Sequence, residues 1–169
     1  MRGLGGPPHP HGPSSAWISY NGNMFRRSSH SVWDCRYHLV WATKRRRRAL
    51  RHENERAYSE RLLRRMAEKY NMYVVAIEVA EDHVHMCAEI PPQLSVGAAV
   101  RMYKILSARH MVKRFPHLNR YFWGGPMWCP SCFVPAAGEG VTEGAVRKYV
   151  ETCDEGTERG PVQAEFFRK

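Results

Sequence analysis

The sequence predicts an α+β fold of the ferredoxin-like (RRM-like) type, in which two helices cover one face of an antiparallel sheet. Three observations lead to this prediction. Several segments alternate apolar and polar residues as strands do, and two longer segments repeat apolar residues at helical spacing. Their order is strand, helix, strand, strand, helix, strand, which is the split βαβ order, and a further helix follows. The second face of the sheet is then left open, and the last helix can pack over it.

Composition narrows the class of partner. At 169 residues and 43% hydrophobic content the chain suits one domain with a core. No apolar run approaches the ~20 residues that cross a bilayer, and the Gly/Pro-rich start is not typical of a signal peptide, so we expect no membrane partner. Five cysteines without framework spacing favour a reducing cytoplasm. The formal charge of +10 indicates a polyanionic partner, with nucleic acid as the first candidate.

The first part of the chain is expected to hold a disordered extension, a strand and a basic run. Residues 1–30 are rich in Gly and Pro and are expected to be disordered, and Met24 could be the natural start. Residues 31–153 are expected to form the domain. Ser31 to Thr43 alternates as one strand. The basic run that follows is either a solvated loop or a patch that contacts phosphates. Its members are Lys44, Arg45, Arg46, Arg47 and Arg48.

Two helices and a hairpin follow. Apolar spacing predicts a helix from Glu53 to Tyr70, whose buried stripe is Tyr58, Leu62, Leu63, Met66 and Tyr70. Met72 to Val79 is β-rich and pairs with the next strand as an antiparallel hairpin. Ser95 is a suitable N-cap for a helix that ends near Arg114. On this helix Arg101 and Lys104 are candidate DNA contacts. Its predicted buried stripe is Val96, Ala99, Val100, Tyr103 and Leu106.

The end of the domain is expected to contain one or two short strands and a helix. Tyr121 to Val134 is aromatic and rich in turn residues, which predicts the strands. Thr142 is a suitable N-cap for a final helix that reaches Cys153. Residues 154–169 are polar and are expected to form a flexible tail.

A His-x-His pair marks the candidate site. Strand side chains alternate, so Val84, Met86, Ala88 and Ile90 share the core face, whereas His83, His85, Cys87 and Glu89 share the other face. Two neighbouring imidazoles supply half of a small metal site. The alternative is a pair of half-buried histidines bonded to backbone.

The last predicted helix carries the second half of a possible site. Tyr149 and Cys153 lie one turn apart on it, and Lys148 directly precedes the tyrosine. Tyr149 is either a core residue of an amphipathic helix or a nucleophile. A phenol has a pKa near ~10, so a nucleophilic role needs a polarised phosphate or nearby cations.

Four sequence motifs follow one another along the chain. They are Tyr37-His38-Leu39-Val40-Trp41-Ala42-Thr43-Lys44, Asp82-His83-Val84-His85, Trp123-Gly124-Gly125 with Trp128, and Val141-Thr142-Glu143 before Lys148-Tyr149-Val150. Together they resemble the small single-tyrosine transposases with a His-hydrophobic-His (HUH) motif, which insertion sequences of bacteria and archaea encode and which are related to REP-associated tyrosine transposases. The resemblance spans about Ser31 to Cys153.

The resemblance implies a homodimer that binds single-stranded DNA hairpins at the ends of a mobile element. A divalent metal, magnesium or manganese, held by His83 and His85 would polarise the scissile phosphate. Tyr149 would attack it, forming a 5′-phosphotyrosine link and releasing a 3′-hydroxyl. In this family the tyrosine helix can serve the histidines of the partner subunit, so the site can be composite across the dimer.

Two departures from the family pattern matter. The family usually has glutamine, a third metal ligand, four residues after the tyrosine, and this chain has Cys153 there. Cys153 as third ligand would favour a softer metal, since magnesium prefers oxygen donors; Asp154 is a possible substitute, and an impaired site is another outcome. Ala80-Glu81 stands where the family often has Met-Pro, which is expected to alter the turn more than the chemistry.

Three alternative functions remain open. An impaired or domesticated relative would bind hairpins without cleaving them. A histidine-triad hydrolase would need a third histidine where Cys87 stands, and an RNA-binding open sheet would carry stacking aromatics in place of His83 and His85. Cys129 and Cys132 have metal-knuckle spacing, but no second Cys-x-x-Cys completes a zinc site.

Overall fold

The computed structural model describes residues 16–20, 23–27 and 32–135. The chain divides into two compact units between Asp34 and Cys35, and each is described by itself. In the described residues, no helix has the length and apolar character needed to cross a membrane.

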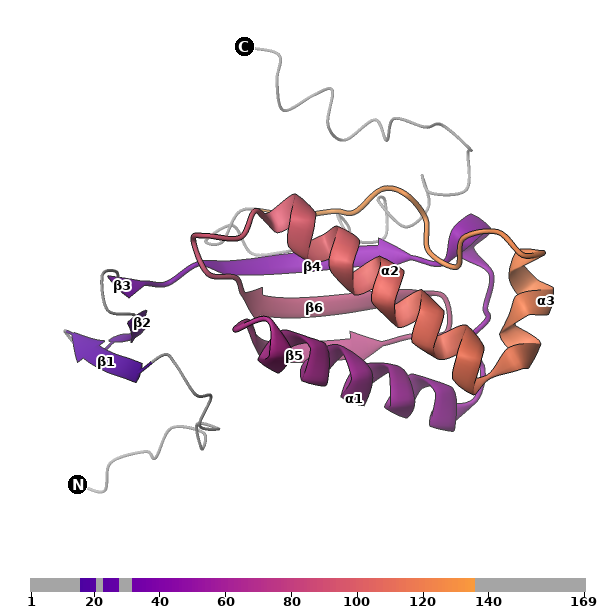
Figure 1. Ribbon diagram of the computed structural model, residues 1–169, viewed down its shortest axis with the longest axis horizontal. Coiled ribbons are helices and arrows are strands. Elements are labelled where there is room, and N and C mark those ends of the chain that lie inside the picture. Colours follow the sequence, from indigo (N-terminus) through magenta and orange to yellow (C-terminus); the bar gives the residue numbers. More distant parts are fainter. Residues whose placement is uncertain (1–15, 21–22, 28–31, 136–169) are drawn as a thin grey trace, which may run out of the picture. The chain divides into compact units, whose positions relative to one another are not determined.

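The larger unit is built on an antiparallel sheet in the order β4-β6-β5 (Figure 1). Its strands are β4 (Arg36–Ala42), β5 (Tyr73–Val79) and β6 (His83–Glu89). β5 and β6 form the predicted hairpin, and β4 pairs along the other edge of β6 from Arg36 opposite Glu89 to Ala42 opposite His83. The His-x-His strand is therefore central, with a neighbour on each side.

Both long helices pack on the same face of this sheet (Figure 1). They are α1 (Glu53–Lys69) and α2 (Val96–Arg114), and Ser95 caps α2 by accepting a hydrogen bond from the amide of Ala98 at 3.2 Å. The fully buried core side chains come from the strands and from both helices: Leu39, Trp41, Leu63, Val84, Met86, Ala99, Tyr103 and Met111. The two-helix, one-face architecture confirms the ferredoxin-like α+β prediction.

The predicted helical stripes agree with the packing except at one end. On α2 the predicted residues are buried or packed against the core. On α1 Tyr70 is exposed rather than buried, because the helix ends at Lys69 and Asn71 adopts a left-handed conformation (φ 56°) that turns the chain toward β5.

The aromatic segment 121–134 differs from its prediction. After η2 (Pro116–Leu118) its first residues belong to a short helix, α3 (Asn119–Phe122), and the remainder runs along the outer edge of β4 without forming a continuous strand. Isolated bridges join Val40 with Phe133 and Thr43 with Trp128. Pro126 and Pro130 lack amide hydrogens, so the segment cannot complete a ladder. It still occupies the place of the fourth strand.

The smaller unit contains an antiparallel sheet in the order β1-β2-β3. Its strands are β1 (Ala16–Tyr20), β2 (Asn23–Arg27) and β3 (Val32–Trp33). The expectation of disorder for residues 1–30 is therefore wrong for 16–20 and 23–27. The strand predicted from Ser31 to Thr43 is also divided, since β3 and β4 belong to different sheets.

The final predicted helix, Thr142 to Cys153, and the predicted tail, 154–169, lie outside the described residues. Lys148, Tyr149 and Cys153 therefore stay predictions from the sequence.

Candidate functional site: the histidine face of the sheet

His83 and His85 lie on the sheet face opposite α1 and α2, as the alternation predicts. Val84, Met86 and Ala88 are fully buried on the helix side, whereas both histidines are half-buried. Across the strands, His83 pairs with Ala42, and His85 lies between Val40 on β4 and Glu78 on β5. His83 and His85 therefore point to the same face of the sheet, two residues apart on β6.

Asp82 fixes the orientation of His83. A hydrogen bond of 2.8 Å joins His83 Nδ1 to Asp82 Oδ1. A carboxylate can only accept, so Nδ1 carries the proton and the lone pair lies on Nε2. A carboxylate behind a metal-binding imidazole raises the basicity of the nitrogen that faces the metal. His83 is therefore prepared to bind a cation through Nε2.

Asp82 also contacts the basic run. Its other oxygen, Oδ2, lies 3.5 Å from Nη2 of Arg46, and its backbone carbonyl accepts a hydrogen bond from the amide of Thr43 at 2.8 Å. One carboxylate thus links a histidine of the candidate site to an arginine at the end of β4.

The surroundings of His85 favour its neutral form. Burial lowers the pKa of His85, and the nearby His38 and His83 also lower it, while Glu78 acts in the opposite direction. A neutral imidazole keeps a lone pair for a metal.

His38 is a third histidine on this face, and sequence reasoning did not assign it to the site. It lies on β4, with its ring centre 5.9 Å from that of His85, and its Nδ1 is buried with no hydrogen-bond partner among the described residues. The signal was present, because His38 alternates with the buried Leu39 and pairs opposite Cys87. The sequence alone did not show that β4 lies next to β6, which brings His38 close to His85.

The described part of the chain supplies an incomplete metal site. Within it, no group of three or more His, Cys, Asp or Glu side chains is arranged to hold a metal ion. Two histidines with available nitrogens fit half of such a site. The sequence prediction places a third donor, Cys153, outside the described residues.

The basic run makes a tight turn at the end of β4 beside the β5–β6 connection. It begins with η1 (Lys44–Arg46), in which Arg45 and Arg46 both have left-handed backbone, with φ of 55° and 47°. Such a backbone conformation is uncommon for residues other than glycine and carries some strain. The hydroxyl of Thr43 closes the turn by donating to the carbonyl of Arg47 at 2.7 Å.

The members of the run are not equivalent. Arg45 and Arg48 are exposed, whereas Lys44, Arg46 and Arg47 are partly buried. Arg48 lies 3.9 Å from Glu81 in an exposed pair, which is worth little in water. Arg45 and Arg48 therefore suit phosphate contacts, and Arg46 is directed to Asp82.

The structure places Lys104, a predicted DNA contact, inside the protein. It is 9% exposed, and its Nζ donates to the carbonyls of Cys129 (2.9 Å), Pro130 (3.1 Å) and Ser131 (2.5 Å). Residues 123–134, which run along the outer edge of β4, are called the edge segment below. The charge of Lys104 anchors this segment to α2.

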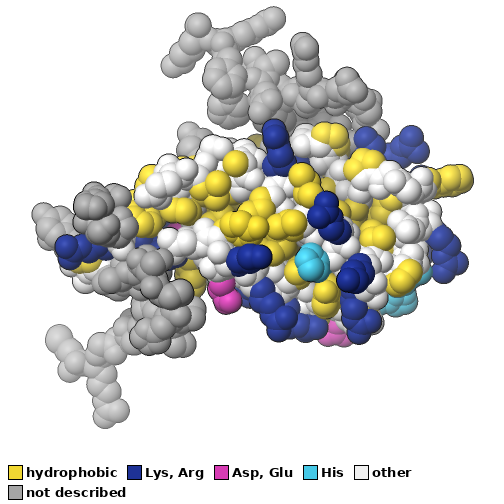
Figure 2. All heavy atoms as spheres, viewed as in Figure 1, with side chains coloured by type: hydrophobic (Ala, Val, Ile, Leu, Met, Phe, Trp, Pro, Cys, Tyr) yellow, Lys and Arg dark blue, Asp and Glu magenta, His cyan; other side chains and the backbone are white. Residues whose placement is uncertain are grey.

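Arg101 is exposed, but it lies away from the histidines. It belongs to α2, on the helix-covered face, beside a shallow hollow that Tyr70, Met102 and Ile105 also line. Figure 2 shows this face, where Lys and Arg side chains surround a hydrophobic area. Arg101 therefore lies on the opposite side of the sheet from His83 and His85.

The Cys-x-x-Cys pair lies on the edge segment. Cys129 is buried, and its Sγ is 3.5 Å from Ser131 Oγ. Burial raises the pKa of the Cys132 thiol to about 11, so the thiol stays protonated at neutral pH.

Comparisons with known proteins point to one group. Residues 31–153 match the family described as "Transposase IS200 like". The chain is 31% identical over 123 residues to the transposase of insertion sequence element IS200 from Salmonella typhimurium, covering 73% of this chain and 79% of that protein. It is 33% identical over 121 residues to the ISDra2 transposase TnpA of Deinococcus radiodurans, covering 72% and 85%.

A solved structure is also similar. The crystal structure of a putative transposase from Deinococcus radiodurans superimposes with a TM-score of 0.67 at 34% identity. The match covers 74% of this chain and 95% of that one.

Proposed function

The chain belongs to the IS200-like transposase family, and from this premise we propose that it cleaves and rejoins single-stranded DNA at hairpin-marked element ends through a covalent link to Tyr149. The observation that carries the proposal is the histidine face. It presents His83 and His85 side by side, with Asp82 holding the tautomer that leaves Nε2 available.

We assign the metal site to His83, His85 and a third donor at Cys153. The two imidazoles fit a divalent cation because one has a fixed tautomer and the other has a lowered pKa. When bound there, the cation supplies charge that polarises the scissile phosphate. A thiolate as third ligand favours manganese, cobalt or zinc over magnesium.

In the proposed reaction Tyr149 is the nucleophile. Its phenolic oxygen loses a proton and bonds to the phosphorus, and the bond from phosphorus to the 3′-oxygen breaks. The departing oxygen takes up a proton and becomes a free 3′-hydroxyl, while the 5′-phosphate stays on the tyrosine. Attack by another 3′-hydroxyl reverses the step and joins strands, so no nucleotide cofactor is needed.

The exposed arginines of the basic run would hold the DNA backbone near this face. Ala42, at the end of β4, pairs with His83, and the run starts two residues later. Phosphates bound by Arg45 and Arg48 would therefore lie at the same end of the sheet as His83.

We further propose that the enzyme is a homodimer whose sites combine the histidines of one subunit with the tyrosine of the other. This proposal rests on the family pattern, in which the tyrosine helix can serve the histidines of the partner subunit.

The test is covalent capture of a labelled single-stranded element end on a denaturing gel, with magnesium, manganese or zinc. The wild type should give a metal-dependent band that Tyr149→Phe abolishes while hairpin binding is kept, because only the nucleophilic oxygen is lost. Cys153→Gln should shift the preference toward magnesium.

A band that persists in Tyr149→Phe would refute the assignment of the nucleophile. Hairpin binding without a band in any metal would favour the second candidate, an impaired relative that only binds hairpins. The replacement of the family's usual glutamine by Cys153 is the feature that favours this alternative.

A further inference from the structure

Trp123 is the most exposed large hydrophobic side chain among the described residues. It is 84% exposed, whereas Trp41 and Trp128 are buried and pack against each other edge to face. Exposing an indole to water loses the free energy that its burial would provide. Packing of the fold therefore gives no role to this indole, which is free to bind a ligand.

The backbone around Trp123 holds the side chain outward. Trp123 has a left-handed conformation (φ 52°), and its amide donates to the carbonyl of Asn119 at 2.9 Å. Gly124 follows with φ 74°, and the amide of Gly125 donates to the carbonyl of Phe122 at 2.7 Å. A Cβ on Gly125 would lie 3.1 Å from that carbonyl oxygen, so the turn is tight. The exposed indole therefore lies on a turn that backbone hydrogen bonds hold in one conformation.

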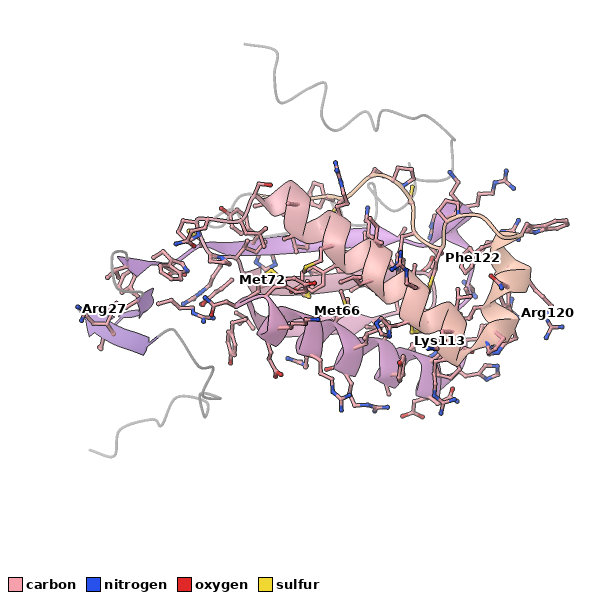
Figure 3. All side chains as sticks on the ribbon, viewed as in Figure 1. Arg27, Met66, Met72, Lys113, Arg120 and Phe122 are labelled. Carbon is pink, nitrogen blue, oxygen red and sulfur yellow. The ribbon has the colours of Figure 1, made fainter. Side chains whose placement is uncertain are left out.

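A buried neighbour anchors this turn to the core. Phe122 is 8% exposed and belongs to the hydrophobic core, directly before Trp123. Figure 3 shows Phe122 on the inner side of α3, whereas Arg120 points away from it into open space. The chain therefore buries one aromatic residue and presents the next one to solvent.

The surroundings of Trp123 are basic. Arg120, Lys113 and Arg114 are exposed at this end of the larger unit. Four residues after Trp123, the carbonyl of Met127 accepts a hydrogen bond from the amide of Lys44 at 2.8 Å, which joins the segment to the basic run. In Figure 1, α3 and the end of β4 lie at the same end of the sheet. This is the end where His83 begins β6.

We propose that Trp123 is a stacking platform for an unpaired base of single-stranded DNA, whose phosphates contact the arginines around it. Every base has a flat face that can stack on an indole, and single-strand binding sites combine such aromatics with a positive groove. A polyanion suits this end better than an apolar protein surface, because Lys113, Arg114 and Arg120 are exposed at the same end of the larger unit (Figure 3). The inference rests on the proposed function, since it concerns DNA that the transposase binds.

The experiment is a fluorescence-anisotropy titration of three labelled hairpins with metal chelated to prevent cleavage. One hairpin is blunt, one carries a short single-stranded extension, and one carries an extension of the same length made of abasic nucleotides. Trp123→Ala is compared with wild type, with Trp123→Tyr, and with Tyr70→Ala, which removes an exposed aromatic from the helix-covered face.

Trp123→Ala should weaken binding of the base-bearing extension by about 5- to 150-fold. Binding of the abasic and blunt hairpins should stay unchanged, because the phosphates and arginines remain. Trp123→Tyr should keep most of the affinity, and Tyr70→Ala should match wild type.

The inference is overturned if Trp123→Ala binds the base-bearing extension as wild type does, or loses affinity equally for the abasic one. A change from dimer to monomer in Trp123→Ala, measured by light scattering, would also overturn it and assign Trp123 to a subunit contact. Either result leaves the proposed function intact if the wild-type protein still gives a metal-dependent band in the covalent-capture assay. A wild type that binds none of the three hairpins contradicts the proposed function itself.

Discussion

Asp82 links two parts of the candidate site that lie far apart in the sequence. One carboxylate oxygen holds His83 Nδ1 at 2.8 Å, and the other lies 3.5 Å from the guanidinium of Arg46. Because the carboxylate lies between the imidazole of His83 and the guanidinium of Arg46, it fixes both the tautomer and the direction of His83. It acts through His83 and is a positioning residue.

Asp82→Ala should lower the affinity for Mn²⁺ by about 10- to 100-fold, since the outer partner of a metal-binding histidine typically contributes this much. Isothermal titration calorimetry measures the loss without any need for activity. Asp82→Asn should lose less, because the amide oxygen still accepts from Nδ1. Glu81→Ala is the matched control in the same turn. Within the described residues, the ion pair of the Glu81 side chain is with the exposed Arg48. Equal affinities in Asp82→Ala and wild type would contradict the positioning role.

At this scale the alternation of residues predicts part of the site. It correctly assigns His83 and His85 to the face opposite Val84 and Met86, since side-chain direction in a strand depends only on position. It cannot predict the contact of His38 with His85, which depends on the pairing of β4 with β6. Nor can it predict the contact between Arg46 and Asp82, because this depends on two left-handed residues that are not glycine.

At the scale of elements, the edge segment is held by side-chain hydrogen bonds from α2 in place of a continuous strand ladder with β4. Its prolines interrupt the ladder with β4, and the carbonyls of residues 129–131 turn to the ammonium of Lys104. The Trp128 indole donates to Ser107 Oγ at 2.8 Å, which adds a second bond to α2. A lysine on a helix is usually solvated, so the sequence favoured a DNA contact.

Lys104→Met should lower the free energy of unfolding by about 1.5–3 kcal/mol, because it removes a charged donor from buried carbonyls. Urea denaturation followed by circular dichroism measures the change. Arg101→Met on the same helix is the control and should leave stability nearly unchanged, since Arg101 is exposed. A Lys104→Met protein of wild-type stability that loses affinity for DNA would restore the original assignment.

Helices and strands were predicted correctly where the apolar pattern repeats over many residues, and were missed where it extends over only a few. Both long helices and the hairpin agree with their spacing, because tertiary packing uses the same apolar stripe. The strands β1 and β2 were missed because a Gly/Pro-rich composition outweighed a local signal. Tyr20 pairs with Asn23, and the two residues between them, Asn21-Gly22, are the pair that short hairpins favour.

At the scale of the whole molecule, the proposed site is shared between two subunits. Mixing a His83→Ala/His85→Ala variant with Tyr149→Phe tests this arrangement by the covalent-capture assay. Each variant alone should be inactive. After subunit exchange, about a quarter of the wild-type sites should return, because half of the dimers are mixed and each of these has one intact site. No recovery in a mixture that light scattering shows to be exchanged would place the histidines and tyrosine in the same subunit.

The central claim is that Tyr149 becomes covalently linked to the 5′-phosphate of the cleaved strand. Peptide mass spectrometry of the captured complex tests this claim most directly. Trypsin should cut after Lys148 and Arg159 and release a peptide in which Tyr149 is the sole tyrosine. After nuclease digestion, the account predicts that this peptide bears a nucleotide through a phosphate on the tyrosine oxygen, in samples with metal and not in samples with chelator. A nucleotide on any other residue, or an unmodified peptide from a complex that gives a covalent band, would contradict it.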